Sequence, residues 1–275
     1  MIVEVNDLLL NVEGSGDGPP VVLLHGFTGS SRSLLSFARS WPGFSTLALD
    51  VIGHGMSDSP EDASRYTMDR CIDDIEALVE VLDLGKIALL GYSMGGRIAV
   101  RYALRHPERL WALVLESAST GIEDEAERQA RIQSDEALAQ RLERKGLEPF
   151  IDYWQSIPLW ASQASLPQEK RDALRAQRMQ NSVTGLANSL RGMGAGADPA
   201  VFDKLSTLEV PSLIMAGGLD TKYRDLAIAM GATMPDATVR ILDNAGHAAH
   251  FEQPAAFANA VFEFLQIHAP AGAPS

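Results

Sequence analysis

The sequence predicts an α/β protein with a mostly parallel, twisted sheet flanked by helices. Short apolar runs typical of buried strands alternate with stretches of helical periodicity, and this alternation indicates parallel βαβ units. One long stretch without strand character interrupts the pattern and predicts a helical insertion. The chain has 275 residues, a length that suits a single α/β core with one insertion.

Six short runs predict the parallel strands. Apolar residues dominate them without a regular alternation, which is typical of strands that helices cover on both faces. Before the first run, residues 1–12 suit an antiparallel hairpin at one edge of the sheet. The runs are residues 21–24, 46–49, 87–90, 112–115, 212–216 and 238–242.

Helices are expected between these strands, and a longer helical segment is expected as a cap. Half of residues 123–148 are charged, which predicts a solvated helix, whereas the stretch around Pro158 is apolar and aromatic. The predicted helices are residues 68–82, 95–106, 222–234 and 254–267. The predicted domains are a core of residues 1–119 and 202–268, a helical cap of residues 120–201 inserted after the sixth strand, and a frayed tail of residues 269–275.

Composition narrows the class of ligand and the compartment. The chain carries 23 Lys and Arg against 36 Asp and Glu, a formal charge of −13, which disfavours nucleic acid and anionic membranes as partners. An anionic small-molecule substrate would need arginine or lysine side chains in its pocket. Cys71 is the single cysteine, and no apolar run approaches the ~20 residues of a spanning helix. We expect a cytoplasmic protein, and the oligomeric state stays open.

Ser93 is the candidate nucleophile. It lies in a G-x-S-x-G motif, between Gly91 and Gly95, that follows a predicted strand and opens a predicted helix. This strand, turn and helix context is that of a nucleophile elbow, in which side chains at the two glycines would collide with neighbouring backbone. The alternative is a glycine-rich turn with a capping serine.

A serine needs a histidine to take its proton, and that histidine needs an acid to orient it. His247 follows the last predicted strand and is the best candidate base, with His250 as its competitor. Asp220 follows the strand at residues 212–216 and is the candidate acid. The alternatives Asp225 and Asp243 fall inside a helix and on the far side of the turn.

An oxyanion hole requires backbone N–H groups near the nucleophile. The loop that follows the strand at residues 21–24 and the residue after Ser93 supply them, so we assign the N–H groups of Phe27 and Met94. No group of histidine, cysteine and carboxylate residues has metal-ligand spacing, and no phosphate-binding glycine motif occurs. The sequence therefore implies neither a metal nor a nucleotide cofactor.

These motifs, together with the D-x-x-G-H-G-x-S turn at residues 50–57, resemble the α/β-hydrolase superfamily along essentially the whole chain. A narrower resemblance is to the 2-succinyl-6-hydroxy-2,4-cyclohexadiene-1-carboxylate synthases of menaquinone biosynthesis. It rests on HGFTGS at 25–30, GYSMGGR at 91–97, Trp154 with Pro158 and Leu159, GLANSLRGMG at 185–194 and DTKY at 220–223. Gly218, where an acidic residue is common, departs from the family pattern.

The resemblance implies a lyase that eliminates pyruvate from a substrate with three carboxylates, using the Ser-His-Asp machinery as a base. It also implies six substrate-binding side chains. Arg97 has independent support, because it lies one helical turn after Ser93. The implied residues are Tyr92, Arg97, Arg131, Trp154, Arg178 and Lys222.

Two other functions use the same motifs. A serine carboxylesterase or a C–C bond hydrolase of this fold needs the same triad and a water molecule. A ligand receptor could keep the triad without turnover, although a complete triad under a charged cap favours catalysis. Fold alone does not choose between them.

Overall fold

The computed structural model describes residues 1–38 and 41–270. In these residues eight strands form one sheet in the order β1-β2-β4-β3-β5-β6-β7-β8. The pairs β1 with β2 and β2 with β4 are antiparallel, and every other pair is parallel. The strands are β1 (Ile2–Val5), β2 (Leu8–Ser15), β3 (Pro20–Leu24), β4 (Ser45–Leu49), β5 (Ile87–Tyr92), β6 (Leu110–Glu116), β7 (Ser212–Gly217) and β8 (Ala237–Leu242).

This sheet confirms the predicted α/β architecture, because each predicted run lies inside an observed parallel strand. The central strands β5, β6 and β7 are buried along their whole length. The prediction of two covered faces is wrong for β8, where half-buried and exposed positions alternate along most of the strand. This strand is at the edge of the sheet and pairs with β7, so one of its faces meets solvent.

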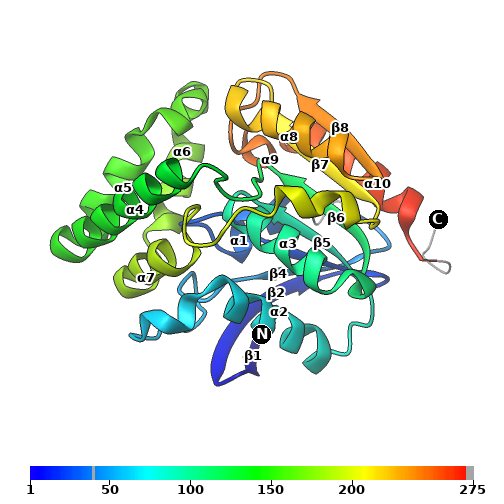
Figure 1. Cartoon of the computed structure of the whole chain (residues 1–275), viewed down its shortest axis with the longest axis horizontal. Coiled ribbons are helices and arrows are strands. Elements are labelled where there is room, and N and C mark those ends of the chain that lie inside the picture. Colours follow the sequence, from blue (N-terminus) through cyan, green and yellow to red (C-terminus); the bar gives the residue numbers. More distant parts are fainter. Residues whose placement is uncertain (39–40, 271–275) are drawn as a thin grey trace.

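Helices cover the two faces of the sheet and form a separate hydrophobic core on each (Figure 1). One core includes Ile72, Ile98 and Met230, from α2, α3 and α8. The other includes Leu34 and Phe257, from α1 and α10. The short, serine-rich α1 was not predicted. The helices are α1 (Ser31–Ala38), α2 (Met68–Val81), α3 (Met94–Arg105), α8 (Thr221–Thr233), α9 (Ala249–Glu252) and α10 (Pro254–His268).

The segment between β6 and β7 forms the cap, which lies beside the sheet in Figure 1. Its first helix begins after the N-cap Asp124 and ends before the C-cap Gly146, and only Asp135, Ala139 and Leu142 in it are fully buried, as its charged sequence predicts. A third hydrophobic cluster, including Leu142, Phe150 and Leu186, holds the cap helices together. The cap contains α4 (Glu125–Lys145), α5 (Leu147–Ser156), the 3-10 helix η3 (Pro158–Ser165), α6 (Gln168–Arg178) and α7 (Val183–Met193).

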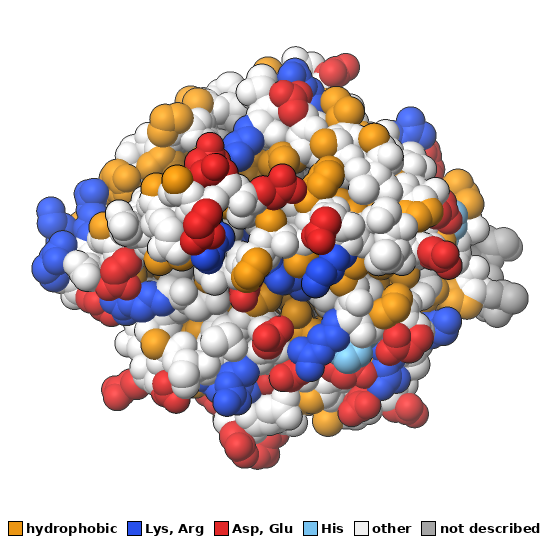
Figure 2. All heavy atoms as spheres, in the orientation of Figure 1, with side chains coloured by type: hydrophobic (Ala, Val, Ile, Leu, Met, Phe, Trp, Pro, Cys, Tyr) orange, Lys and Arg blue, Asp and Glu red, His pale blue; other side chains and the backbone are white. Residues whose placement is uncertain are grey.

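The surface carries both signs of charge. Figure 2 shows acidic and basic side chains interspersed over one face of the molecule, without a large basic field. No helix in the described part of the chain is long and apolar enough to cross a membrane. Residues 271–275 of the predicted frayed tail lie outside the described residues.

Candidate active site

Ser93 lies in a sharp turn between β5 and α3. Its backbone has φ of 53° and ψ of −106°, a strained conformation for a residue with a side chain. The neighbouring glycines make the turn possible. A Cβ atom at Gly95 would collide with the carbonyl oxygen of Leu24, and one at Gly91 would collide with the carbonyl oxygen of Gly95.

The three predicted catalytic side chains are hydrogen-bonded in series. The Oγ atom of Ser93 lies 2.9 Å from Nε2 of His247, and Nδ1 of His247 lies 2.7 Å from Oδ2 of Asp220. Because Nδ1 faces a carboxylate, it carries the proton, and Nε2 is left to accept the proton of Ser93. His247 is 1% exposed. The arrangement can act as a general base.

The alternative base and acids lie elsewhere. His250 donates its backbone N–H to Glu116, and its Nδ1 lies 2.8 Å from the same buried carboxylate. This pair links α9 to the end of β6, next to the elbow. Asp225 pairs with Arg224 on the surface, and Asp243 is exposed.

The loop that carries Phe27 is fixed by two buried histidines. The His25 ring donates from Nδ1 to the Gly26 carbonyl (2.8 Å) and accepts at Nε2 from the Val51 N–H (3.1 Å). Its ring packs against His54, with centroids 5.0 Å apart. Burial lowers the pKa of His25 and lowers that of His54 to about 3, so both are neutral at pH 7.

The two backbone groups assigned to the oxyanion hole flank the elbow. The Phe27 N–H has no hydrogen-bond partner among residues 1–38 and 41–270, and Met94 is the first residue of α3, where amides have no acceptor within the helix. Gly26 brings the loop close, since a Cβ atom there would lie 3.4 Å from Cβ of Ser93.

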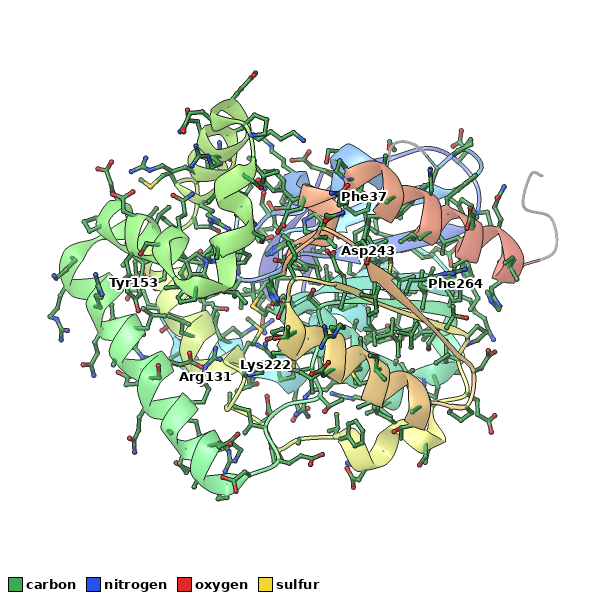
Figure 3. The ribbon with its side chains drawn as sticks, turned by 90° about the horizontal axis from the view of Figure 1, so that it is seen from above. Phe37, Arg131, Tyr153, Lys222, Asp243 and Phe264 are labelled. Carbon is green, nitrogen blue, oxygen red and sulfur yellow. The ribbon has the colours of Figure 1, made fainter. Side chains whose placement is uncertain are left out.

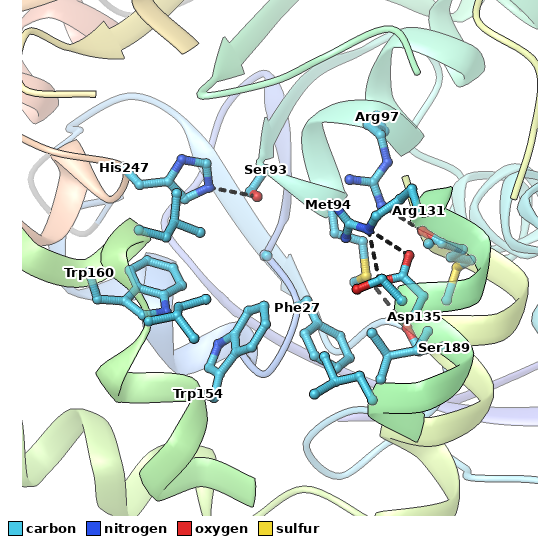
Figure 4. Close-up of a pocket in the computed structure, with 18 of the residues that line it drawn as sticks. Phe27, Ser93, Met94, Arg97, Arg131, Asp135, Trp154, Trp160, Ser189 and His247 are labelled. Atoms are coloured by element: carbon cyan, nitrogen blue, oxygen red, sulfur yellow. Dashed lines mark hydrogen bonds and ion pairs between the residues drawn. The ribbon is translucent and has the colours of Figure 1, made fainter. Parts of the chain in front are cut away.

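A cavity of about 280 Å³ opens over Ser93, between the cap and the core (Figure 4). Its walls include Phe27, Trp154 and Trp160 on one side, and Arg97 and Arg131 on the other. Aromatic rings surround the base, because Trp160 and Tyr223 pack edge-on against His247 with centroid distances of 5.5 and 4.5 Å.

The two arginines of this cavity differ in their partners. Arg97 is half-buried, and Nη2 donates to the Met193 carbonyl (2.5 Å), while its buried Nε has no hydrogen-bond partner among the described residues. Burial lowers the pKa of Arg97, although a guanidinium remains charged at pH 7. Arg131 donates its Nε to the buried carboxylate of Asp135 (2.8 Å).

Arg178 faces a second cavity of about 230 Å³ that shares Tyr92 and Trp160 with the first. The side chain is buried, its guanidinium carbon lies 4.9 Å from the Trp160 ring centroid, and burial lowers its pKa to about 10. Nη1 of Arg178 finds no hydrogen-bond partner in the described part of the chain. This cation is therefore available to an anion.

Lys222 is placed differently from the other implied substrate-binding residues. It is exposed at the start of α8 and lies outside the residues that line either cavity. Figure 3 shows it on the side of the core that faces the cap. Its neighbour Tyr223 lines the Ser93 cavity instead, because consecutive helix positions point about 100° apart.

Asp135, Trp160 and Tyr223 line the Ser93 cavity, but sequence reasoning did not single them out as site residues. The spacing of Arg131 and Asp135 on one helix was a usable signal, since residues four apart face each other. No group of three histidine, cysteine or carboxylate side chains among the described residues could hold a metal ion.

Comparison with known proteins places these features in a family. Residues 19–254 match the family model described as alpha/beta hydrolase fold. A Bacillus subtilis (strain 168) protein named "Putative 2-succinyl-6-hydroxy-2,4-cyclohexadiene-1-carboxylate synthase" is 40% identical over 92% of both chains. The 2-succinyl-6-hydroxy-2,4-cyclohexadiene-1-carboxylate synthase from Enterobacter sp. (strain 638) is 33% identical over 90% of this chain and 92% of its own length.

Two solved structures are similar to this chain in both fold and sequence. The structure of MenH from S. aureus has a TM-score of 0.90 and 30% identity, covering 94% of this chain and 99% of its own. A thermophilic esterase from Thermogutta terrifontis, with malate bound, has a TM-score of 0.84 and 27% identity, covering 95% of this chain and 94% of its own.

Proposed function

Because the chain belongs to the alpha/beta hydrolase family, and within it to the 2-succinyl-6-hydroxy-2,4-cyclohexadiene-1-carboxylate synthases, we propose that it is a lyase of menaquinone biosynthesis. It eliminates pyruvate from 2-succinyl-5-enolpyruvyl-6-hydroxy-3-cyclohexene-1-carboxylate and leaves the compound that names the family. The observation that carries this proposal is a complete Ser93–His247–Asp220 series opening into a cavity with two arginines.

The triad works here as a base. His247 takes the proton of Ser93 at Nε2, and the serine oxygen removes a ring proton next to the substrate ketone. The Phe27 and Met94 N–H groups stabilise the enolate that forms. The C–O bond to the enolpyruvyl group then breaks, and the leaving oxygen receives a proton from His247. The released enol becomes pyruvate.

The cations fit a substrate with three carboxylates. Arg97 and Arg131 lie at one end of the Ser93 cavity, and Arg178 lies in the adjoining cavity behind Tyr92 and Trp160. In a protein of charge −13, these side chains reverse the local sign of the potential. We assign them to carboxylate binding, with Tyr92 and Trp154 as walls, and leave out Lys222, which lines neither cavity.

The second candidate is a carboxylesterase. The likeness to a malate-bound esterase favours it, and the same triad would form an acyl-enzyme that water hydrolyses. A pocket for neutral esters has no use for a buried arginine, however. Receptor function is disfavoured because the triad geometry is complete.

A coupled pyruvate assay on the purified protein tests the proposal. We expect pyruvate release from the tricarboxylate substrate and only feeble hydrolysis of a neutral p-nitrophenyl ester. Arg97→Ala should weaken tricarboxylate binding by about ten-fold to a hundred-fold, the effect of losing a charge-assisted contact, and leave ester hydrolysis unchanged. Strong ester hydrolysis without pyruvate release would show that the chain is an esterase and not a lyase.

We also infer that the enzyme works in the cytoplasm on a small anionic molecule. The single buried Cys71 suits a reducing compartment. Fractionation of cells that express the chain would test the location.

A further inference from the structure

We propose that Asp135 is a positioning residue that holds Arg131 with the two terminal nitrogens of its guanidinium free to bind a substrate carboxylate. This inference rests on the proposed function, because it takes the substrate to be a polycarboxylate. It explains an unexpected feature of the Ser93 cavity, which contains a carboxylate of its own beside two arginines.

The geometry of the pair carries the proposal. Arg131 and Asp135 lie four residues apart on α4, and Nε of Arg131 lies 2.8 Å from both Asp135 oxygens (Figure 4). Nη1 and Nη2 of Arg131 donate no hydrogen bond to any described residue. A guanidinium held through Nε still presents a pair of donors that matches the two oxygens of a carboxylate.

Asp135 is better enclosed than its partner. Its side chain is 6% exposed, whereas that of Arg131 is 40% exposed. A long side chain with such exposure samples many rotamers unless a contact fixes it. Gly194 makes room for the fixing group, because a Cβ atom there would lie 2.5 Å from Oδ2 of Asp135.

The charge of Asp135 also allows the two arginines to share one cavity. Arg131 acts to lower the pKa of Arg97, and Asp135 acts to raise it. Burial raises the pKa of Asp135 itself, against the opposing effect of Arg131. Arg97, Arg131 and Asp135 together leave one net positive charge, which a ligand carboxylate can neutralise.

The same contacts also fit an opposite role for Asp135. A carboxylate beside Arg131 could compete with the ligand, in which case its removal would tighten binding. The two roles differ in sign, so affinity measurements separate them.

The experiment measures binding of propane-1,2,3-tricarboxylate by calorimetry to the full chain and its variants. We expect Asp135→Ala to weaken binding about ten-fold, the loss of one charge-assisted contact. Asp135→Asn should weaken it about three-fold, since the amide oxygen still accepts from Nε. In the lyase assay the KM should rise in the same order while kcat changes less.

A matched control lies next to Asp135 on the same helix. Glu136 pairs with Arg191 at 2.8 Å, and neither residue lines the two cavities, so Glu136→Gln weakens an ion pair away from the Ser93 cavity and should leave binding unchanged. In an Arg131→Ala background, Asp135→Ala should cause no further loss, because the residue acts through Arg131.

Each outcome decides the proposal. Unchanged or tighter tricarboxylate binding by both Asp135 variants would overturn the proposal. It would also be overturned if Asp135→Ala weakened binding as much in the Arg131→Ala background as in the unsubstituted chain. Absence of binding by the unsubstituted chain would overturn it as well. If Asp135→Ala does not fold, the Asp135→Asn result decides alone. Tricarboxylate binding without pyruvate release would refute the proposed function and leave the role of Asp135 standing.

Discussion

Nε2 of His247 lies 2.9 Å from Oγ of Ser93, although the two residues are 154 positions apart in the chain. The distance is short because β5 and β8 run in the same direction, so the loops that follow them meet at one edge of the sheet. The helical cap lies in the intervening sequence without separating them.

Replacing Ser93 by alanine should lower pyruvate release by at least about 10³-fold, as for other triad nucleophiles. The side chain contributes little packing, so circular dichroism and the thermal midpoint should stay near those of the unsubstituted chain. A coupled pyruvate assay measures the loss. Retention of most activity by a folded variant would show that the elbow serine is not essential.

Asp220→Asn should reduce turnover by about 10³- to 10⁴-fold, and His247→Ala should reduce it further. The acid orients the imidazole and stabilises its protonated form, whereas the histidine itself carries the proton. In the unsubstituted chain the Tyr223 N–H donates to Oδ1 of Asp220 (3.3 Å) at the start of α8. The oxygen of the asparagine amide can accept the same hydrogen bond, so α8 should stay intact. Asp225→Asn and Asp243→Asn are the controls. If either control lost more turnover than Asp220→Asn, that residue would be the catalytic acid instead.

Arg178→Met should raise the thermal midpoint and weaken tricarboxylate binding at least about ten-fold. A buried cation without a carboxylate partner costs desolvation energy, and an unbranched apolar side chain of similar length avoids it. Arg175, on the same helix, pairs with Glu148 and Asp152 at the surface, so Arg175→Met should not affect binding. A lower midpoint for Arg178→Met would show that its contact with Trp160 outweighs the desolvation.

Stability should fall as the pH drops below 6.5, because His54 is neutral in the fold. Its pKa is lowered from 6.5 to about 3, so the unfolded chain gains a proton first, between these two values. Linkage gives a loss on the order of 2 kcal/mol between pH 7.5 and 5. Urea unfolding at both pH values should show a smaller difference for His54→Asn, whose amide can donate to Ile52 like Nδ1. If the free energy of unfolding falls equally with pH in both proteins, a residue other than His54 is responsible.

Local signals predicted the three side chains that the fold brings together as a hydrogen-bonded series. The sharp turn needs glycines at fixed offsets from Ser93 for steric reasons, so a short motif with its flanking strand and helix was enough to predict the turn. His247 and Asp220 followed from their places after predicted strands. Each inference depended on a strand ending at a known residue, which a run of buried apolar side chains marks well.

The sequence by itself determined the α/β fold class, the order of the parallel strands along the chain and the residues at the strand ends, because hydrophobic periodicity and turn sterics act over short distances. Only the tertiary structure decided that Tyr223 lines the cavity while Lys222 is exposed, that Arg178 opens into a separate cavity, and that Asp135 joins the arginines. Those placements depend on how the cap packs against the core. Contacts between distant segments fix that packing, and no local pattern records them.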